Sequence, residues 1–150
     1  MVISESLYLD FVQEVKRNWP KKSFGYFLAN DYGEDPDDFV MFTKDLRDEI
    51  KDQFELYGNY YINNKDAGFL ADPYETLELE KKLIRRKKKK VGVFHSHKRH
   101  PSIFSSVDID LHPDKRLWHL IISLRNMNMP QIKVFQIRDD EKIREIEWQF

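Results

Sequence analysis

In the first half of the chain, apolar residues first recur at a helical spacing and then form short continuous runs. Leu7, Phe11 and Val15 recur at the spacing of one helix face, so we expect a helix over residues 5–18. Ser4 or Ser6 can cap it, and Pro20 ends it. Apolar runs at 24–29 and 39–43 flank a stretch rich in Asp, Gly and Pro, which predicts a hairpin.

The second half predicts one long helix followed mainly by strands. Asp72 caps that helix, Pro73 takes its first position, and the helix extends to about 86 or 88. Further along we expect a strand over 91–97, a short helix over 106–112, and strands over 118–124, 132–137 and 143–148. This order predicts a single α/β domain over residues 1–150, with a mixed sheet flanked by helices.

Residues 44–68 follow no clear pattern. The charged part, 44–55, is compatible with a short helix. The turn-rich part, 58–64, is equally compatible with a substrate-facing loop and with a surface connection.

Composition narrows the classes of function. Charges nearly balance, at a formal net charge of -1, so global charge does not favour nucleic acid or membrane as a partner. The chain has no cysteine, which excludes disulfides and thiolate metal sites. No secretory signal pattern and no apolar run of about 18 residues is visible, so we expect a cytoplasmic protein.

A basic run at 85–90 has two interpretations. It can be the solvated end of the second helix, or it can join Lys98, Arg99 and His100 in a positive rim near the candidate site below, where it would attract an acidic partner. Nucleic-acid binding through this run is the less favoured alternative.

The candidate site is the pattern H-x-H-x7-S-x-x-D, formed by His95, His97, Ser105 and Asp108. Side chains two apart on a strand point the same way, so both imidazoles can reach one point, and one turn of helix can bring Asp108 there. Two imidazoles and a carboxylate suit Zn²⁺, and three protein ligands leave a fourth position open.

Together with the apolar runs 91–94 and 120–124, this pattern resembles the JAMM (MPN-plus) metallopeptidases. Weaker support comes from 20–29 and from 72–74. The resemblance implies the MPN (JAB) fold, which is related to the cytidine-deaminase architecture. It also implies hydrolysis of the bond that follows the C-terminus of a ubiquitin-like protein. A deaminase is disfavoured, because its H-x-E and P-C-x-x-C motifs are missing.

The resemblance also implies a role for each residue of the pattern. His95, His97 and Asp108 would bind zinc, with a water as the fourth ligand. Ser105 would donate a hydrogen bond to the oxyanion of the tetrahedral intermediate. The remaining histidines, His100, His112 and His119, lie outside the pattern, and we expect them to be surface or packing residues.

One departure from the family concerns catalysis. The position that matches the family's general-base glutamate is the catalytic candidate Lys22, and a protonated lysine cannot accept a proton from water. A lysine whose pKa is lowered by burial or by a nearby Zn²⁺ can act as a base, which is the less favoured case. Three explanations are open. The chain can be a weakened or inactive module that binds zinc and a ubiquitin-like partner; position 22 can be altered or out of register; or another carboxylate, such as Glu14 or Glu34, can serve. Lys98 also replaces a family proline, which should affect loop stiffness more than metal binding.

Overall fold

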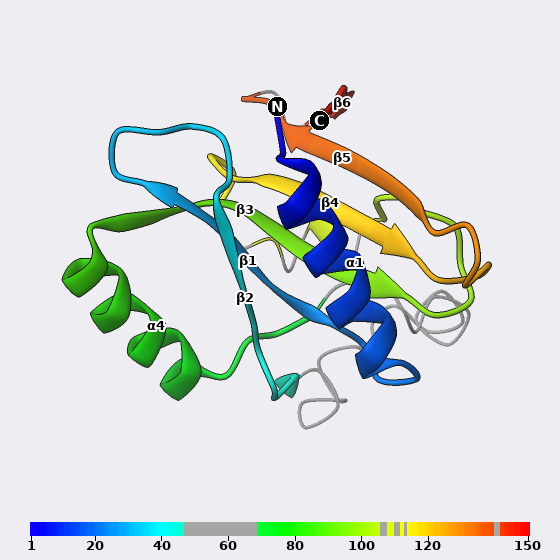
Figure 1. The fold of residues 1–150 in the computed structure, drawn as a ribbon, viewed down its shortest axis with the longest axis horizontal. Helices are drawn as coiled ribbons and strands as arrows, with labels where there is room; N and C mark the ends of the chain where they lie inside the picture. Colours follow the sequence, from blue (N-terminus) through cyan, green and yellow to red (C-terminus); the bar gives the residue numbers. More distant parts are fainter. Residues whose placement is uncertain (47–68, 106–107, 110–111, 113, 140–141) are drawn as a thin grey trace.

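The computed structural model describes residues 1–46, 69–105, 108–109, 112, 114–139 and 142–150. Its sheet has six strands in the order β2-β1-β3-β4-β5-β6. The strands are β1 (Phe24–Asn30), β2 (Asp38–Met41), β3 (Lys88–His97), β4 (Trp118–Ser123), β5 (Gln131–Ile137) and β6 (Ile143–Ile146), and the helices are α1 (Glu5–Asn18) and α4 (Pro73–Arg86) (Figure 1). The predicted mixed sheet flanked by helices is therefore confirmed.

Both helices begin where their capping residues predict. The Ser4 hydroxyl accepts a hydrogen bond from the Leu7 amide at the start of α1, and the Asp72 carboxylate accepts one from the Tyr74 amide at the start of α4. α4 ends at Arg86 because Lys87 takes the left-handed conformation, with φ of 53°. The basic run 85–90 was expected to close this helix, but its last three residues instead open β3.

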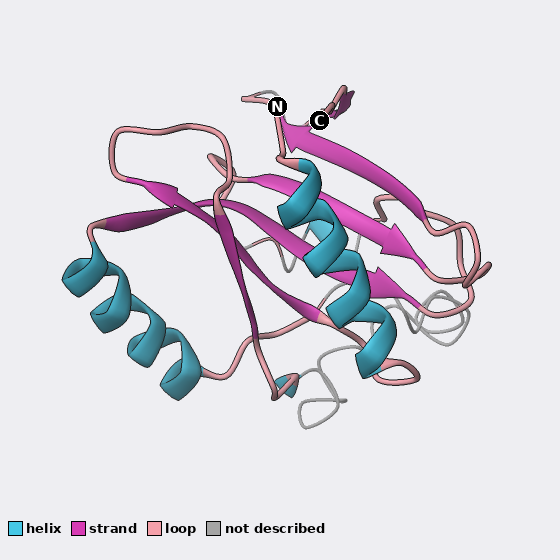
Figure 2. Ribbon diagram, viewed as in Figure 1, coloured by secondary structure: helices cyan, strands magenta, loops and turns pink. Residues whose placement is uncertain are grey.

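β3 lies in the middle of the sheet. It pairs antiparallel with β1 and parallel with β4, and every other strand pair is antiparallel. Side chains alternate across it: Phe94 packs in the core beneath α1, and Val93 packs with Leu79 and Leu83 of α4 on the opposite face. Figure 2 shows α1 lying across one face of the sheet.

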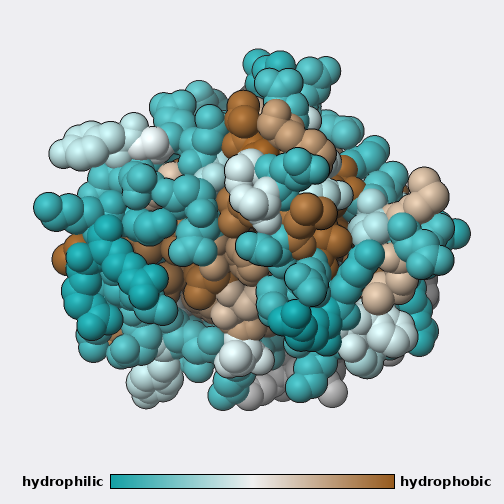
Figure 3. All heavy atoms as spheres, in the orientation of Figure 1, coloured by the Kyte–Doolittle hydropathy of each residue, from teal (hydrophilic) through white to brown (hydrophobic). Residues whose placement is uncertain are grey.

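The surface on the α1 side is largely hydrophilic, with hydrophobic side chains gathered near the helix (Figure 3). In the part of the chain that the structure describes, no helix is long and apolar enough to span a membrane. The residues predicted as a short helix at 44–55 and as a loop at 58–64 fall almost entirely outside the described ranges. Asp108 and Ile109 are helical, as expected for the short helix at 106–112, and β6 ends earlier than predicted.

Candidate metal centre

The two histidines of the motif close the buried end of β3. His95 and His97 lie on the sheet face that also carries Val93, and their exposed fractions are 0% and 3%. Because β3 is flanked by β1 and β4, both rings are surrounded by sheet and by the segments packed over it. The fold therefore buries two polar rings that need partners.

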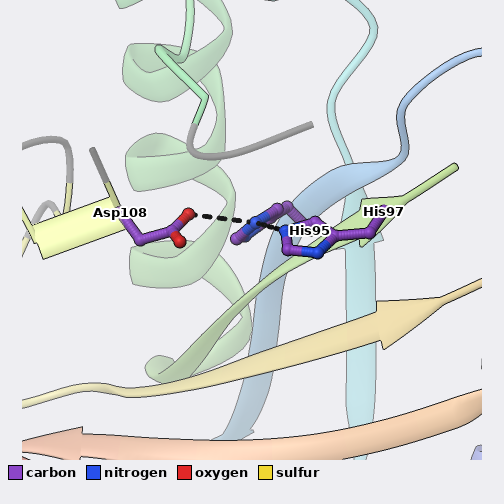
Figure 4. A group of neighbouring side chains, drawn as sticks. All are labelled: His95, His97 and Asp108. Atoms are coloured by element: carbon purple, nitrogen blue, oxygen red, sulfur yellow. Dashed lines mark hydrogen bonds and ion pairs between the residues drawn. The ribbon is translucent and has the colours of Figure 1, made fainter. Parts of the chain in front are cut away.

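Asp108 completes a group of three possible ligands. The Nε2 atoms of His95 and His97 are 2.9 Å apart, and the Asp108 Oδ1 lies 3.1 Å from the His95 Nε2. One ligand atom from each residue lies within 4.8 Å of the others, and Asp108 is fully buried (Figure 4). The structure thus brings together the three residues that the motif predicts as ligands.

His97 is oriented by the loop that follows β3. Its Nδ1–H donates to the Pro101 carbonyl at 2.8 Å, which turns its Nε2 toward the His95 Nε2, 2.9 Å away. Ser102 ties this loop to β5, because its hydroxyl donates to the Gln131 carbonyl at 2.7 Å. The acceptor that orients His97 is therefore itself held by the sheet.

Asp108 is oriented by Ser105. Both the backbone N–H and the hydroxyl of Ser105 donate to the Asp108 Oδ2 at 2.7 Å, which leaves Oδ1 directed toward His95. Burial alone would raise the pKa of Asp108, but the charge and hydrogen bond of His95, with the Ser105 amide, hold that pKa well below its usual range. The carboxylate is therefore ionised and ready to bind a cation.

The contacts of Ser105 bear on its expected role. The resemblance predicts that its hydroxyl donates to an oxyanion, whereas here the single hydroxyl proton is directed to Asp108. In this arrangement Ser105 orients the candidate ligand Asp108, and its donation to an oxyanion stays a prediction.

These residues fit a zinc ion. Nitrogen from two imidazoles and oxygen from one carboxylate form a common zinc ligand set, and three protein ligands are typical of catalytic sites. The outward atoms of His97 and Asp108 are held by Pro101 and Ser105, and their inward atoms face His95, where a metal could replace these contacts.

A fourth histidine, His119 of β4, lies against the site. It is 2% exposed, and its Nε2 lies 2.7 Å from the Nδ1 of His95. Its own Nδ1 lies 3.0 Å from the Nδ1 of His112. His119 was expected to be a surface or packing residue, and that expectation misses its hydrogen bond to a candidate ligand.

Lys22 lies at the edge of the site by register. Phe24 pairs with His95, and the Ser96 amide donates to the Ser23 carbonyl at 2.8 Å just before β1 begins. If this register is continued by one residue, Lys22 lies opposite His97. Lys22 is half-buried there.

Neither alternative carboxylate reaches the site. Glu14 is ion-paired with Arg17 on the exposed side of α1. Glu34 lies in the connection after β1, beyond Asn30, which pairs with Lys88 at the far end of β3.

The basic run does not form a rim at the metal centre. β3 has ten residues, so Lys88 and His97 lie roughly 30 Å apart along it. Lys88 is also ion-paired with Asp37, and Lys90 with Glu80. The expected location of this rim is therefore wrong, while an acidic partner for the run stays a prediction.

Comparison with known sequences identifies one family. The profile of the prokaryotic homologs of the JAB domain matches residues 4–138. None of the curated proteins that were compared matches the chain.

Comparison with solved structures supports the same fold. Protein DSY2949 from Desulfitobacterium hafniense superimposes with a TM-score of 0.73 at 22% identity, covering 99% of this chain and 92% of that one. AF2198, a JAB1/MPN domain protein from Archaeoglobus fulgidus, superimposes with a TM-score of 0.55 at 16% identity, covering 100% of both chains.

Proposed function

The chain belongs to the family of prokaryotic homologs of the JAB domain, and we propose that it is a zinc-dependent hydrolase that cuts the bond after the C-terminal tail of a ubiquitin-like protein. The observation that carries this proposal is the convergence of His95, His97 and Asp108, buried and individually oriented, on one point.

His95, His97 and Asp108 would hold the ion. Zinc, when bound, supplies a Lewis acid for the scissile carbonyl and lowers the pKa of water toward ~7. The surrounding sheet excludes bulk water from the ligands, which strengthens their attraction for a cation. Ser105 keeps the carboxylate in place through two hydrogen bonds.

Lys22 is expected to limit turnover. The family resemblance assigns the general base to this position, and a continuation of the Phe24–His95 register by two residues, which would bring it opposite His97, supports that alignment. A protonated ammonium cannot accept a proton, and loss of a general base typically costs ~10²–10⁴-fold in rate. We therefore propose an enzyme with low intrinsic activity.

A second candidate function follows from the same residue. A module that binds zinc and a ubiquitin-like tail without cutting it would need the metal ligands and no general base; the His95, His97 and Asp108 group, together with a lysine at position 22, supports this candidate. The proposed tail would lie extended beside a strand, with main-chain hydrogen bonds as in strand addition. β2 is the outermost strand on the β1 side of the sheet.

The test combines metal analysis with a cleavage assay on a ubiquitin-like fusion protein. Wild type and Lys22→Glu should each hold one zinc ion, and His97→Ala should lose it. Cleavage should be slow in wild type and about 10²-fold faster or more in Lys22→Glu. If both zinc-loaded proteins bind the fusion and neither cuts it, the enzyme proposal fails and the binding module is supported.

A further inference from the structure

Four imidazole rings form a continuous row beside the candidate metal point. The row runs from His97 to His95 at 2.9 Å, from His95 to His119 at 2.7 Å, and from His119 to His112 at 3.0 Å. It ends at the Leu117 carbonyl, 3.1 Å from the Nε2 of His112. Only the first two rings belong to the motif.

The end of the row determines where the protons lie. A carbonyl can only accept, so His112 donates through Nε2–H, and the Nδ1 of its neutral ring is an acceptor. The Nδ1 of His119 must then donate to it, which leaves the Nε2 of His119 as an acceptor. The Nδ1–H of His95 therefore donates to His119.

This order leaves one nitrogen of His95 for a metal. With Nδ1 committed as a donor, only Nε2 can be a ligand, and that atom faces His97 and Asp108. We propose that His119, held in turn by His112, is a positioning residue that fixes the tautomer and the ring plane of His95 for metal binding. This inference rests on the zinc site of the proposed function.

The burial of His119 supports this role of the histidine row. His119 is 2% exposed and lies edge-on to the Phe104 ring, with centroids 5.1 Å apart. A neutral imidazole carries one donor and one acceptor, which is what an internal member of such a row requires.

The partner of His95 is the imidazole of His119, and an imidazole must itself be oriented before it can accept a hydrogen bond. Metal-binding histidines usually donate to a carboxylate or a backbone carbonyl, and either group accepts without further orientation. An imidazole accepts only through its unprotonated nitrogen, so His119 needs its own partner at Nδ1. Damage to His112 should therefore weaken metal binding, although His112 is not in the ligand group.

The first measurement uses the metal-free wild-type protein. Correlation of ring protons with ring nitrogens by NMR distinguishes the two neutral tautomers of each histidine. We expect Nε2–H on His112 and Nδ1–H on His119. A proton on the Nε2 of His119 would overturn the proposed order.

The second measurement is the zinc dissociation constant, obtained by competition with a chelator. His119→Phe keeps a ring of similar shape and removes the acceptor, so the dissociation constant should rise about 10–100-fold. His119→Gln restores an acceptor and should recover part of the loss, whereas a structural role alone would gain nothing from it. His112→Phe should weaken zinc binding less than His119→Phe, and His100→Gln is the matched control at a histidine outside the row.

The outcomes separate this proposal from the proposed function. If folded His119→Phe or His112→Phe binds zinc as tightly as wild type, the histidine row does not position His95. If wild type binds no zinc, the proposed zinc site is wrong. The tautomers of the metal-free protein still show whether the histidine row has the proposed order of hydrogen bonds. Thermal unfolding in the presence of EDTA shows which variants are folded, and His112→Phe keeps the test open if His119→Phe is not.

Discussion

Zinc should stabilise the fold strongly, and Asp108→Asn should remove most of that effect. A ligand that binds only the folded state at a thousand times its dissociation constant stabilises it by about 4 kcal/mol. In a domain of 150 residues, 1 kcal/mol corresponds to about 2–4 °C in Tm. Wild type with zinc should therefore melt about 8–16 °C above wild type with EDTA.

Asp108→Asn keeps the side-chain shape and removes the charge that a buried zinc needs. Loss of an outer partner alone costs about 10–100-fold in affinity, so loss of this ligand should cost about 10³-fold. The zinc concentration used above would then only equal the dissociation constant, which leaves about 0.4 kcal/mol of stabilisation and a shift of about 1–2 °C.

Thermal unfolding followed by circular dichroism, with and without zinc, measures both shifts. Asp10→Asn is the matched control, since it makes the same chemical change on the exposed side of α1. An equal zinc shift in wild type and Asp108→Asn would refute the ligand assignment. An equal Tm for wild type with zinc and with EDTA would refute the site.

Three further predictions concern other residues. Burial is the main reason that the pKa of Tyr26 is raised to about 12. The unfolded state therefore loses this proton first as pH rises, and the free energy of urea unfolding should fall by roughly 2–3 kcal/mol between pH 10 and 12. Tyr26→Phe should abolish that part of the fall. Phe11→Ala removes a ring with 0% exposure and should cost about 3–5 kcal/mol in urea unfolding, whereas a cost below about 1 kcal/mol would contradict the core packing. Ser105→Ala should weaken zinc binding about 10-fold, with Ser105→Thr near wild type; unchanged zinc affinity with slower cleavage would favour the oxyanion role instead.

The helices follow from local rules, and the start of β3 does not. Caps at Ser4 and Asp72 act within one turn, so sequence alone places the starts of α1 and α4. Lys88 and Lys90 suggest a solvated helix end by composition. In the fold their ammonium groups pair with Asp37 and Glu80, from parts of the chain that only tertiary structure brings near.

The candidate ligands could be predicted from the sequence, but the histidine row could not. His95 and His97 are two apart on one strand, so their convergence needs no knowledge of the sheet. His119 sits among apolar residues of β4, where a lone histidine suggests packing. Its contact with His95 depends on the parallel register, in which Ile121 pairs with His95 and His119 lies two residues before it.

Each candidate ligand is oriented by a group that belongs to the fold. The Pro101 carbonyl fixes His97, Ser105 fixes Asp108, and the row ending at the Leu117 carbonyl fixes His95. A site organised in this way orders few groups when the metal binds, which favours affinity. The contacts named here come from Pro101, Ser105 and the histidine row, so we expect a substitution at Lys22 to act on cleavage more than on zinc affinity. Zinc affinity and cleavage rate should therefore respond to different substitutions: affinity to changes in the histidine row, and rate to changes at Lys22.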